Sequence, residues 1–173
     1  MRIQDLRKLL LAAVAAATVV LSVGVPVSAA ADPGTPELPQ LVDQFGAPVT
    51  LDRDAGEIQI AIVVSAKRLR RIKAWEKALR KEFPDLTVVR VADVPRSSPT
   101  DYEKVAEKLR KRLPEDVPVG IDLAGEWASA LDLDTSVPNV LVFDQAGELA
   151  YRQSGMYKKS LYPPLQSAIS DAS

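Results

Sequence analysis

The chain has 173 residues, of which 47% are hydrophobic and 26% charged, a composition typical of a folded globular protein rather than a disordered or fibrous one. Its formal net charge of −1 gives no indication of nucleic-acid binding. It contains no cysteine and no histidine, which excludes thiol nucleophiles, dithiol redox couples, Ser-His catalysis and any metal site that uses either side chain.

The N-terminal segment has the three parts of a secretory signal peptide. A basic start precedes an uncharged run from Leu9 to Ala31 that ends in small residues. We predict cleavage after Ala31 or Ala29 and therefore a periplasmic or secreted protein, and the alternative is an uncleaved membrane anchor. Without residues 1–31 the chain has 142 residues, 19 basic and 22 acidic, with a net charge of −3. That length is sufficient for a self-supporting core.

Two short segments follow the signal peptide. The proline-rich stretch "DPGTPELP" predicts an extended leader over residues 32–38, so that the folded domain occupies residues 39–173. The next stretch, "LVDQFGAPVTL", has two apolar parts around Gln44-Phe45-Gly46, which predicts a small hairpin.

Apolar strands and amphipathic helices alternate through the middle of the chain. The stretches "EIQIAIVV", "LTVVRVADV" and "VPVGIDL" predict three buried strands. The intervening patterns predict a helix from Lys67 to Phe83 closed by Pro84, a helix with Ser98 or Thr100 as its cap, and a short helix in "AGEWASALDL". Helical spacing places Trp75 and Trp127 in the core.

The C-terminal part predicts a second hairpin and a final helix. The stretches "VPNVLVFD" and "ELAYRQSG" flank the turn Gln145-Ala146-Gly147, and the last helix must hold Pro163 and Pro164 in its first turn. The whole order predicts an α/β fold: a central mixed sheet with helices on both faces, its last two strands antiparallel, and an N-terminal β-hairpin extension.

Three stretches carry a resemblance to a known family: "LVDQFGAPVTL", "IDLAGEWASALDL" and "SVPNVLVFDQAGELAYRQSG". In them the chain resembles the thioredoxin-like family, specifically its exported redoxin or TlpA-type branch, over about Leu38 to Ile169. Within that branch it is similar to the small periplasmic YtfJ-type proteins, which also lack the redox pair. The resemblance implies a thioredoxin-like fold.

The resemblance also implies where an active-site face lies. The family's CxxC pair corresponds to a position within Ser65 to Ile72, "SAKRLRRI", and the family's cis proline corresponds to Pro138. Because no cysteine is present, dithiol exchange, disulfide isomerisation and thiol peroxidation do not carry over. A cis bond would expose the Val137 backbone to an extended peptide.

We therefore predict an exported, cysteine-free thioredoxin-like domain that is not an enzyme, uses no cofactor or metal, and binds an envelope protein or peptide. The partner-binding candidates on the former active-site face are Ser65, Ala66, Lys67, Arg68, Val137 and Pro138.

Two alternatives remain open at this stage. One is a hydrolase without a thiol, built on Ser65 and Lys67 as a Ser-Lys pair. The other is binding of an anion or a membrane surface by the basic helix Lys67–Lys73, with Arg68, Arg70 and Arg71 as ligands. A solvated charged face is the plainer interpretation of that cluster. Asp122 is interpreted as a helix cap, and the C-terminal tyrosines as either packed side chains or a partner surface.

Overall fold

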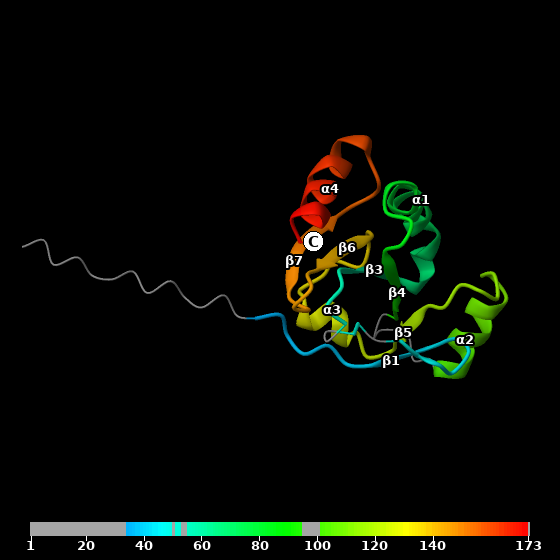
Figure 1. The fold of residues 1–173 in the computed structure, drawn as a ribbon. Helices are drawn as coiled ribbons and strands as arrows, with labels where there is room; N and C mark the ends of the chain where they lie inside the picture. The colour runs from blue at the N-terminus through cyan, green and yellow to red at the C-terminus, as the bar shows by residue number, and fades with distance from the viewer. Residues whose placement is uncertain (1–33, 50, 53–54, 95–100, 173) are drawn as a thin grey trace, which may run out of the picture. The chain divides into compact units, whose positions relative to one another are not determined.

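The computed structural model describes residues 34–49, 51–52, 55–94 and 101–172 (Figure 1). The predicted signal peptide and the cap candidates Ser98 and Thr100 lie outside these residues. The elements are β1 (Leu41–Asp43), β2 (Pro48–Val49), β3 (Gln59–Ser65), the 3₁₀ helix η1 (Ala66–Ile72), α1 (Lys73–Glu82), β4 (Thr87–Asp93), α2 (Tyr102–Arg110), β5 (Gly120–Asp122), α3 (Glu126–Ala130), β6 (Asn139–Phe143), β7 (Leu149–Ser154), the 3₁₀ helix η2 (Lys159–Leu161) and α4 (Tyr162–Asp171).

The strands form one mixed sheet in the order β2-β1-β5-β4-β3-β6-β7. Strands β3, β4 and β5 are parallel, whereas β6 is antiparallel to both β3 and β7, and β1 is antiparallel to β5. All seven residues of β3 are buried, as the apolar stretch "EIQIAIVV" predicts for a central strand. The predicted α/β sheet with an N-terminal hairpin is confirmed.

Helices cover both faces of the sheet (Figure 1). Ile60, Ile62 and Val64 of β3 face a core shared with α1, α2 and α4. Ala61 and Val63, which point to the opposite face, pack in a second core with Trp127 and Leu131 around α3. Among the described residues, no helix has both the length and the apolar character needed to cross a bilayer.

The predicted helix from Lys67 to Phe83 is wrong in its first half. Residues 66–72 form η1, and the α-helical geometry starts only at Lys73. Residues three apart superpose along a 3₁₀ helix, so the buried Leu69 and Ile72 share one side of η1. Ser65, at the N-cap, makes no side-chain cap hydrogen bond, so nothing at this end favours an α-helical start.

Within the described residues, side-chain acceptors cap α2 and α3 at their N-termini. Asp101 accepts a hydrogen bond from Lys104 N and is the cap of α2, a position the sequence analysis assigned to Ser98 or Thr100. Asp122, 1% exposed, accepts bonds from Glu126 N and Trp127 N, which confirms its predicted role as a cap. Pro163 and Pro164 lie in the first turn of α4, as predicted.

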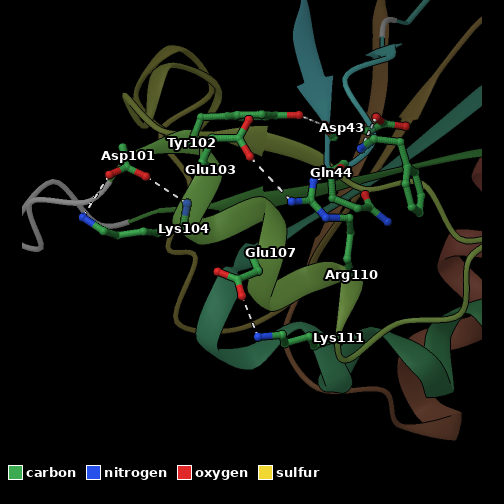
Figure 2. Close-up of polar contacts among 10 residues, drawn as sticks. Asp43, Gln44, Asp101, Tyr102, Glu103, Lys104, Glu107, Arg110 and Lys111 are labelled. Atoms are coloured by element: carbon green, nitrogen blue, oxygen red, sulfur yellow. Dashed lines mark hydrogen bonds and ion pairs between the residues drawn. The ribbon is translucent and has the colours of Figure 1, made fainter.

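Partly buried hydrogen bonds join the N-terminal hairpin to α2 (Figure 2). Arg110 Nη1 donates to the carbonyl of Gln44 at 2.6 Å, and the Tyr102 hydroxyl donates to the carbonyl of Asp43. Gln44 is completely buried, and its amide bridges two backbone groups: Nε2 donates to Val117 O at 2.7 Å and Oε1 accepts from Val119 N at 2.9 Å. Gln44 thus ties the β1–β2 turn to the segment that leads into β5, beside the strand pairing of β1 with β5.

Replacing Gln44 with leucine should lower the free energy of unfolding by about 2–3 kcal/mol, because it leaves a backbone donor and a backbone acceptor without partners. Urea titration of both proteins measures the difference. Gln145→Leu, at an exposed turn, is the control and should change stability by less than about 0.5 kcal/mol. Equal midpoints for the Gln44→Leu variant and the unaltered chain would contradict this assignment.

Candidate functional site

The end of β3 meets a loop that lies about seventy residues further along the chain, residues 134–138, which we term the 134–138 loop. Ser65 N donates to Thr135 O at 2.9 Å. The Thr135 hydroxyl in turn donates to Asp93 at 2.5 Å, and Asp93 is the β4 partner of Ser65. The fold thus brings together the two segments that the sequence analysis assigned to one face.

Two arginines of η1 hold the same loop. Arg68 Nη1 donates to Ser136 O at 2.8 Å, and Arg71 Nη1 donates to the same oxygen at 3.0 Å. Both side chains reach it because residues three apart superpose along η1. Arg70, the third predicted anion ligand, lies on a different side of η1 and lines a separate cleft with Lys67. Of the three arginines predicted to bind one anion, Arg68 and Arg71 therefore contact the 134–138 loop, whereas Arg70 lies on another surface.

The peptide bond before Pro138 is trans, so the expectation of a cis bond is wrong. A trans bond is the usual state of an X-Pro pair, and here hydrogen bonds fix the chain on both sides of it. Val137 N donates to Asp134 O at 3.4 Å, and Val137 O accepts from the Asn139 side chain at 3.0 Å. The backbone groups that an added strand would need are thus bonded within the chain.

Asn139 is a site residue that the sequence analysis missed. Its side chain is 1% exposed and bridges the loop: Nδ2 donates to Asp134 O at 2.9 Å, and Oδ1 accepts from the Ser154 hydroxyl at 2.6 Å. The available signal was a polar amide directly after Pro138, at the start of an otherwise apolar strand. A buried amide in such a place must find partners, and these set the conformation of the loop.

Asp134 is the acidic group of the loop. Hydrogen bonds from the Ser136 hydroxyl and the Ser136 amide, both 2.8 Å long, lower the pKa of this carboxyl below its ordinary value, and the positive charge of Arg68 lowers it further. The loop therefore presents a carboxylate, held on its own backbone, beside a guanidinium.

Met156 is a second residue that the sequence analysis missed. It is 43% exposed and follows Gly155, whose amide donates to Pro138 O and whose carbonyl accepts from Trp75 Nε1. Gly155 has φ +120°, a conformation that residues with a side chain rarely adopt, so the chain bends here with Met156 outside and Tyr157 against Trp75. Tyr162 is also packed, at the edge of Tyr157.

The reactive groups expected of a hydrolase are arranged unfavourably. Ser65 is 8% exposed, whereas Lys67 is exposed to solvent. A lysine that acts as a base beside a serine needs a desolvated position, which Lys67 lacks. Within the described ranges, no three Asp or Glu side chains gather in a way that would hold a metal ion.

Comparisons with known proteins identify the fold. The exposed lipoprotein thioredoxin of Streptococcus pneumoniae matches with a TM-score of 0.58 and 16% identity, over 75% of this chain and 96% of its own. A Chlorobium tepidum protein assigned as the thiol:disulfide interchange protein DsbE matches with a TM-score of 0.57 and 16% identity, over 80% of this chain and 94% of its own. The chain has a thioredoxin-like fold. At these identities the likeness concerns the thioredoxin-like architecture alone.

The similar structures also include a protein of the Sco family. BsSco, a member of the Sco family of cytochrome c oxidase assembly proteins, matches with a TM-score of 0.54 and 13% identity, over 79% of this chain and 92% of its own. No protein-family model matches the sequence, and no curated protein is significantly similar to it. The narrower resemblance to YtfJ-type proteins stays a prediction.

The shared acceptor of Arg68 and Arg71 should make their removal non-additive. Either single change to alanine leaves one guanidinium on Ser136 O and should lower the free energy of unfolding by no more than about 0.2 kcal/mol, well under half the effect of the double change. The double change should lower it by about 1 kcal/mol and speed amide exchange in the 134–138 loop. Strictly additive urea midpoints across the double-mutant cycle would refute this coupling.

Removing the Ser136 hydroxyl should raise the pKa of Asp134 toward its ordinary value of 3.8, because the strongest bond to the carboxylate is lost. A depressed folded-state pKa adds stability above the unfolded-state pKa, and that stability disappears as the pH falls through the folded-state value. Ser136→Ala should therefore destabilise the chain at neutral pH and have no such effect in strong acid. NMR titration of the carboxyl and urea melts at both pH values test this, with Ser160→Ala as control. An unchanged Asp134 titration would count against it.

Proposed function

We propose that this chain is an exported thioredoxin-like domain without thiol redox chemistry that binds a partner protein through its former active-site face. One observation carries the proposal: the polar backbone groups of the face are bonded within the chain, while the side chains it presents outward are two arginines, the Asp134 carboxylate beside Arg68, and an exposed methionine. Arginine and methionine are enriched in protein interfaces. Such a surface suits recognition better than reaction.

The proposed contact uses side chains and not strand addition. Val137 N and Val137 O both have partners inside the loop, so an incoming strand would have to displace them. Arg68 and Arg71 each use one nitrogen on Ser136 O and retain further donors. These donors favour a partner that presents carboxylates around an apolar group, and Met156 is the matching apolar contact.

Export is part of the proposal. The first 31 residues have the composition of a signal peptide, and one of the similar structures is that of an exposed lipoprotein. A cysteine-free domain gains no stability from the disulfides that such a compartment permits, so it depends on its two apolar cores.

The test compares two exposed apolar residues. Met156→Asp should reduce capture of a specific envelope partner by the purified chain at least tenfold, because a charge in the centre of an interface is not tolerated. Phe45→Asp is the matched control: Phe45 is 47% exposed but lies in the β1–β2 turn, away from the face, and should capture normally. Quantitative mass spectrometry of the bound proteins measures both.

The same proteins distinguish the alternatives. Equal capture by the Met156→Asp and Phe45→Asp variants would refute the proposed surface. Turnover of an ester or phosphoester that disappears in Ser65→Ala would replace binding with hydrolysis. Association with anionic vesicles that weakens steeply with salt, without any captured protein, would assign the basic segment to a membrane surface instead.

A further inference from the structure

A cleft lies on the sheet face that carries α1 and α2. Its volume is about 740 Å³, and its walls come from η1, α1, the end of α2 and the segment leading to β5. Apolar side chains, including Ile72, Leu109 and Val119, form much of its lining. Sites for small ligands typically have volumes of roughly 300–1,000 Å³ and mainly apolar walls. We term this hollow the α1–α2 cleft.

The charge of the α1–α2 cleft is strongly one-sided. Seven basic side chains line it and only one acidic one, Glu76; the basic ones are Lys67, Arg70, Lys73, Lys77, Arg80, Arg90 and Arg112. Apart from Arg90, none of the seven makes an ion pair with any residue the structure describes. A net charge of −3 over residues 32–173 makes this concentration a local feature and not a consequence of composition.

The geometry of η1 and α1 produces this arrangement. Lys67, Arg70 and Lys73 follow one another at intervals of three, which superpose along a 3₁₀ helix, and Lys77 and Arg80 continue the row at helical spacing along α1. Arg68 and Arg71 lie on the other side and are bound to the 134–138 loop. The cleft and the former active-site face are thus separate surfaces that share only η1.

Arg90 is the decisive residue. It lies on the central strand β4 with only 8% of its side chain exposed, yet it lines the cleft. Its Nε donates to Glu76, which is 16% exposed, and this is the only hydrogen bond that the Arg90 side chain makes with described residues. A guanidinium has five donors, and burial without partners is costly.

The unused nitrogens of Arg90 are accessible from the cleft. In the part of the chain that the structure describes, every fully buried side-chain nitrogen and oxygen has a hydrogen-bond partner. The unpaired Nη1 and Nη2 atoms are therefore not sealed in the core and must open toward the hollow that Arg90 lines. Two parallel donors of a mostly buried guanidinium in a cleft with apolar side chains match the two oxygens of a carboxylate.

We propose that the α1–α2 cleft binds a small amphiphilic carboxylate. The carboxylate accepts from Nη1 and Nη2 of Arg90, the apolar body packs on Ile72, Leu109 and Val119, and the lysines at the rim attract the ligand and cover it with their aliphatic stems. An acidic helix of a partner protein is the rival occupant. The volume of the cleft and the buried position of the key donor favour the small ligand. This inference does not depend on the proposed partner-binding face.

Isothermal titration of the purified chain with decanoate, below its micelle concentration, tests the proposal. One decanoate should bind per chain, and 1-decanol and acetate should each bind at least about tenfold more weakly, because each supplies only half of the required chemistry. Arg90→Lys keeps a charge opposite Glu76 but loses the two parallel donors, and it should weaken decanoate binding about tenfold.

A rim variant protects the test against loss of folding in Arg90→Lys. Lys73→Gln/Lys77→Gln changes two exposed side chains and should weaken decanoate binding several-fold at low salt with an unchanged unfolding midpoint. Lys81→Gln, on the same helix but outside the cleft, should bind like the unaltered chain. The proposal is overturned by the absence of saturable decanoate binding or by equal affinity for decanol and decanoate. It is also overturned if the Arg90 and rim variants both bind decanoate as tightly as the unaltered chain. Binding of a glutamate-rich helical peptide without decanoate binding would overturn it in favour of a protein partner.

Discussion

The three-residue repeat of η1 is the constraint on which both surfaces of this protein depend. In a 3₁₀ helix, side chains at i and i+3 superpose, so a seven-residue segment sorts into three rows. Leu69 and Ile72 enter the core, Arg68 and Arg71 reach Ser136 O, and Lys67 and Arg70 line the α1–α2 cleft. In an α-helix, with 3.6 residues per turn, residues three apart do not superpose, so Arg68 and Arg71 would not line up in this way over one acceptor.

The loop beside η1 shows how a fold without thiols keeps a defined surface at this position. Three sets of hydrogen bonds hold the loop. They come from the buried side chain of Asn139, from two arginines on the carbonyl of Ser136, and from Ser136 to the carboxylate of Asp134. These bonds join the loop to η1 and to the start of β6, or lie within the loop itself. The result is a loop whose backbone polar atoms are largely bonded within the chain, so that its free polar groups are mainly side chains.

Much of the fold could be predicted from the sequence because its signals are local. Runs of β-branched residues indicated the central strands, turn residues indicated both hairpins, and Asp122 before a short helix indicated a cap. The start of η1 could not be predicted, since the spacing of Leu69, Ile72 and Trp75 fits a period of three as well as one of 3.6. The bond from Ser65 N to Thr135 O, which holds the loop that contains Pro138, joins residues seventy apart, so no local pattern reveals it.

The sequence indicated where the candidate site lies, but not which cations of η1 contact the 134–138 loop and which line the cleft. The family resemblance placed the segments at Ser65 and at Val137 on one face, and the bond from Ser65 N to Thr135 O joins these two segments. The cleft was missed altogether, although one signal was present. Arg90 interrupts an apolar strand, and alternation places it, like Ala92, on the sheet face that α1 and α2 cover.

A charged residue at such a position requires compensation, and the folded chain supplies only part of it through Glu76. Removing Glu76 or Arg90 alone would strand the other in a poorly solvated place, so the pair is maintained by the cost of breaking it as much as by its attraction. The remaining donors of Arg90, together with six uncompensated cations around it, leave the cleft with a positive potential that packing alone does not explain. Apolar walls and hydrated lysines are stable without a ligand, but a buried guanidinium with open donors gains further stability whenever an anion occupies them. Any anion that binds only the folded state adds to its stability by mass action. An anion bound to Arg90 would therefore link the stability of the central sheet to the occupancy of the cleft.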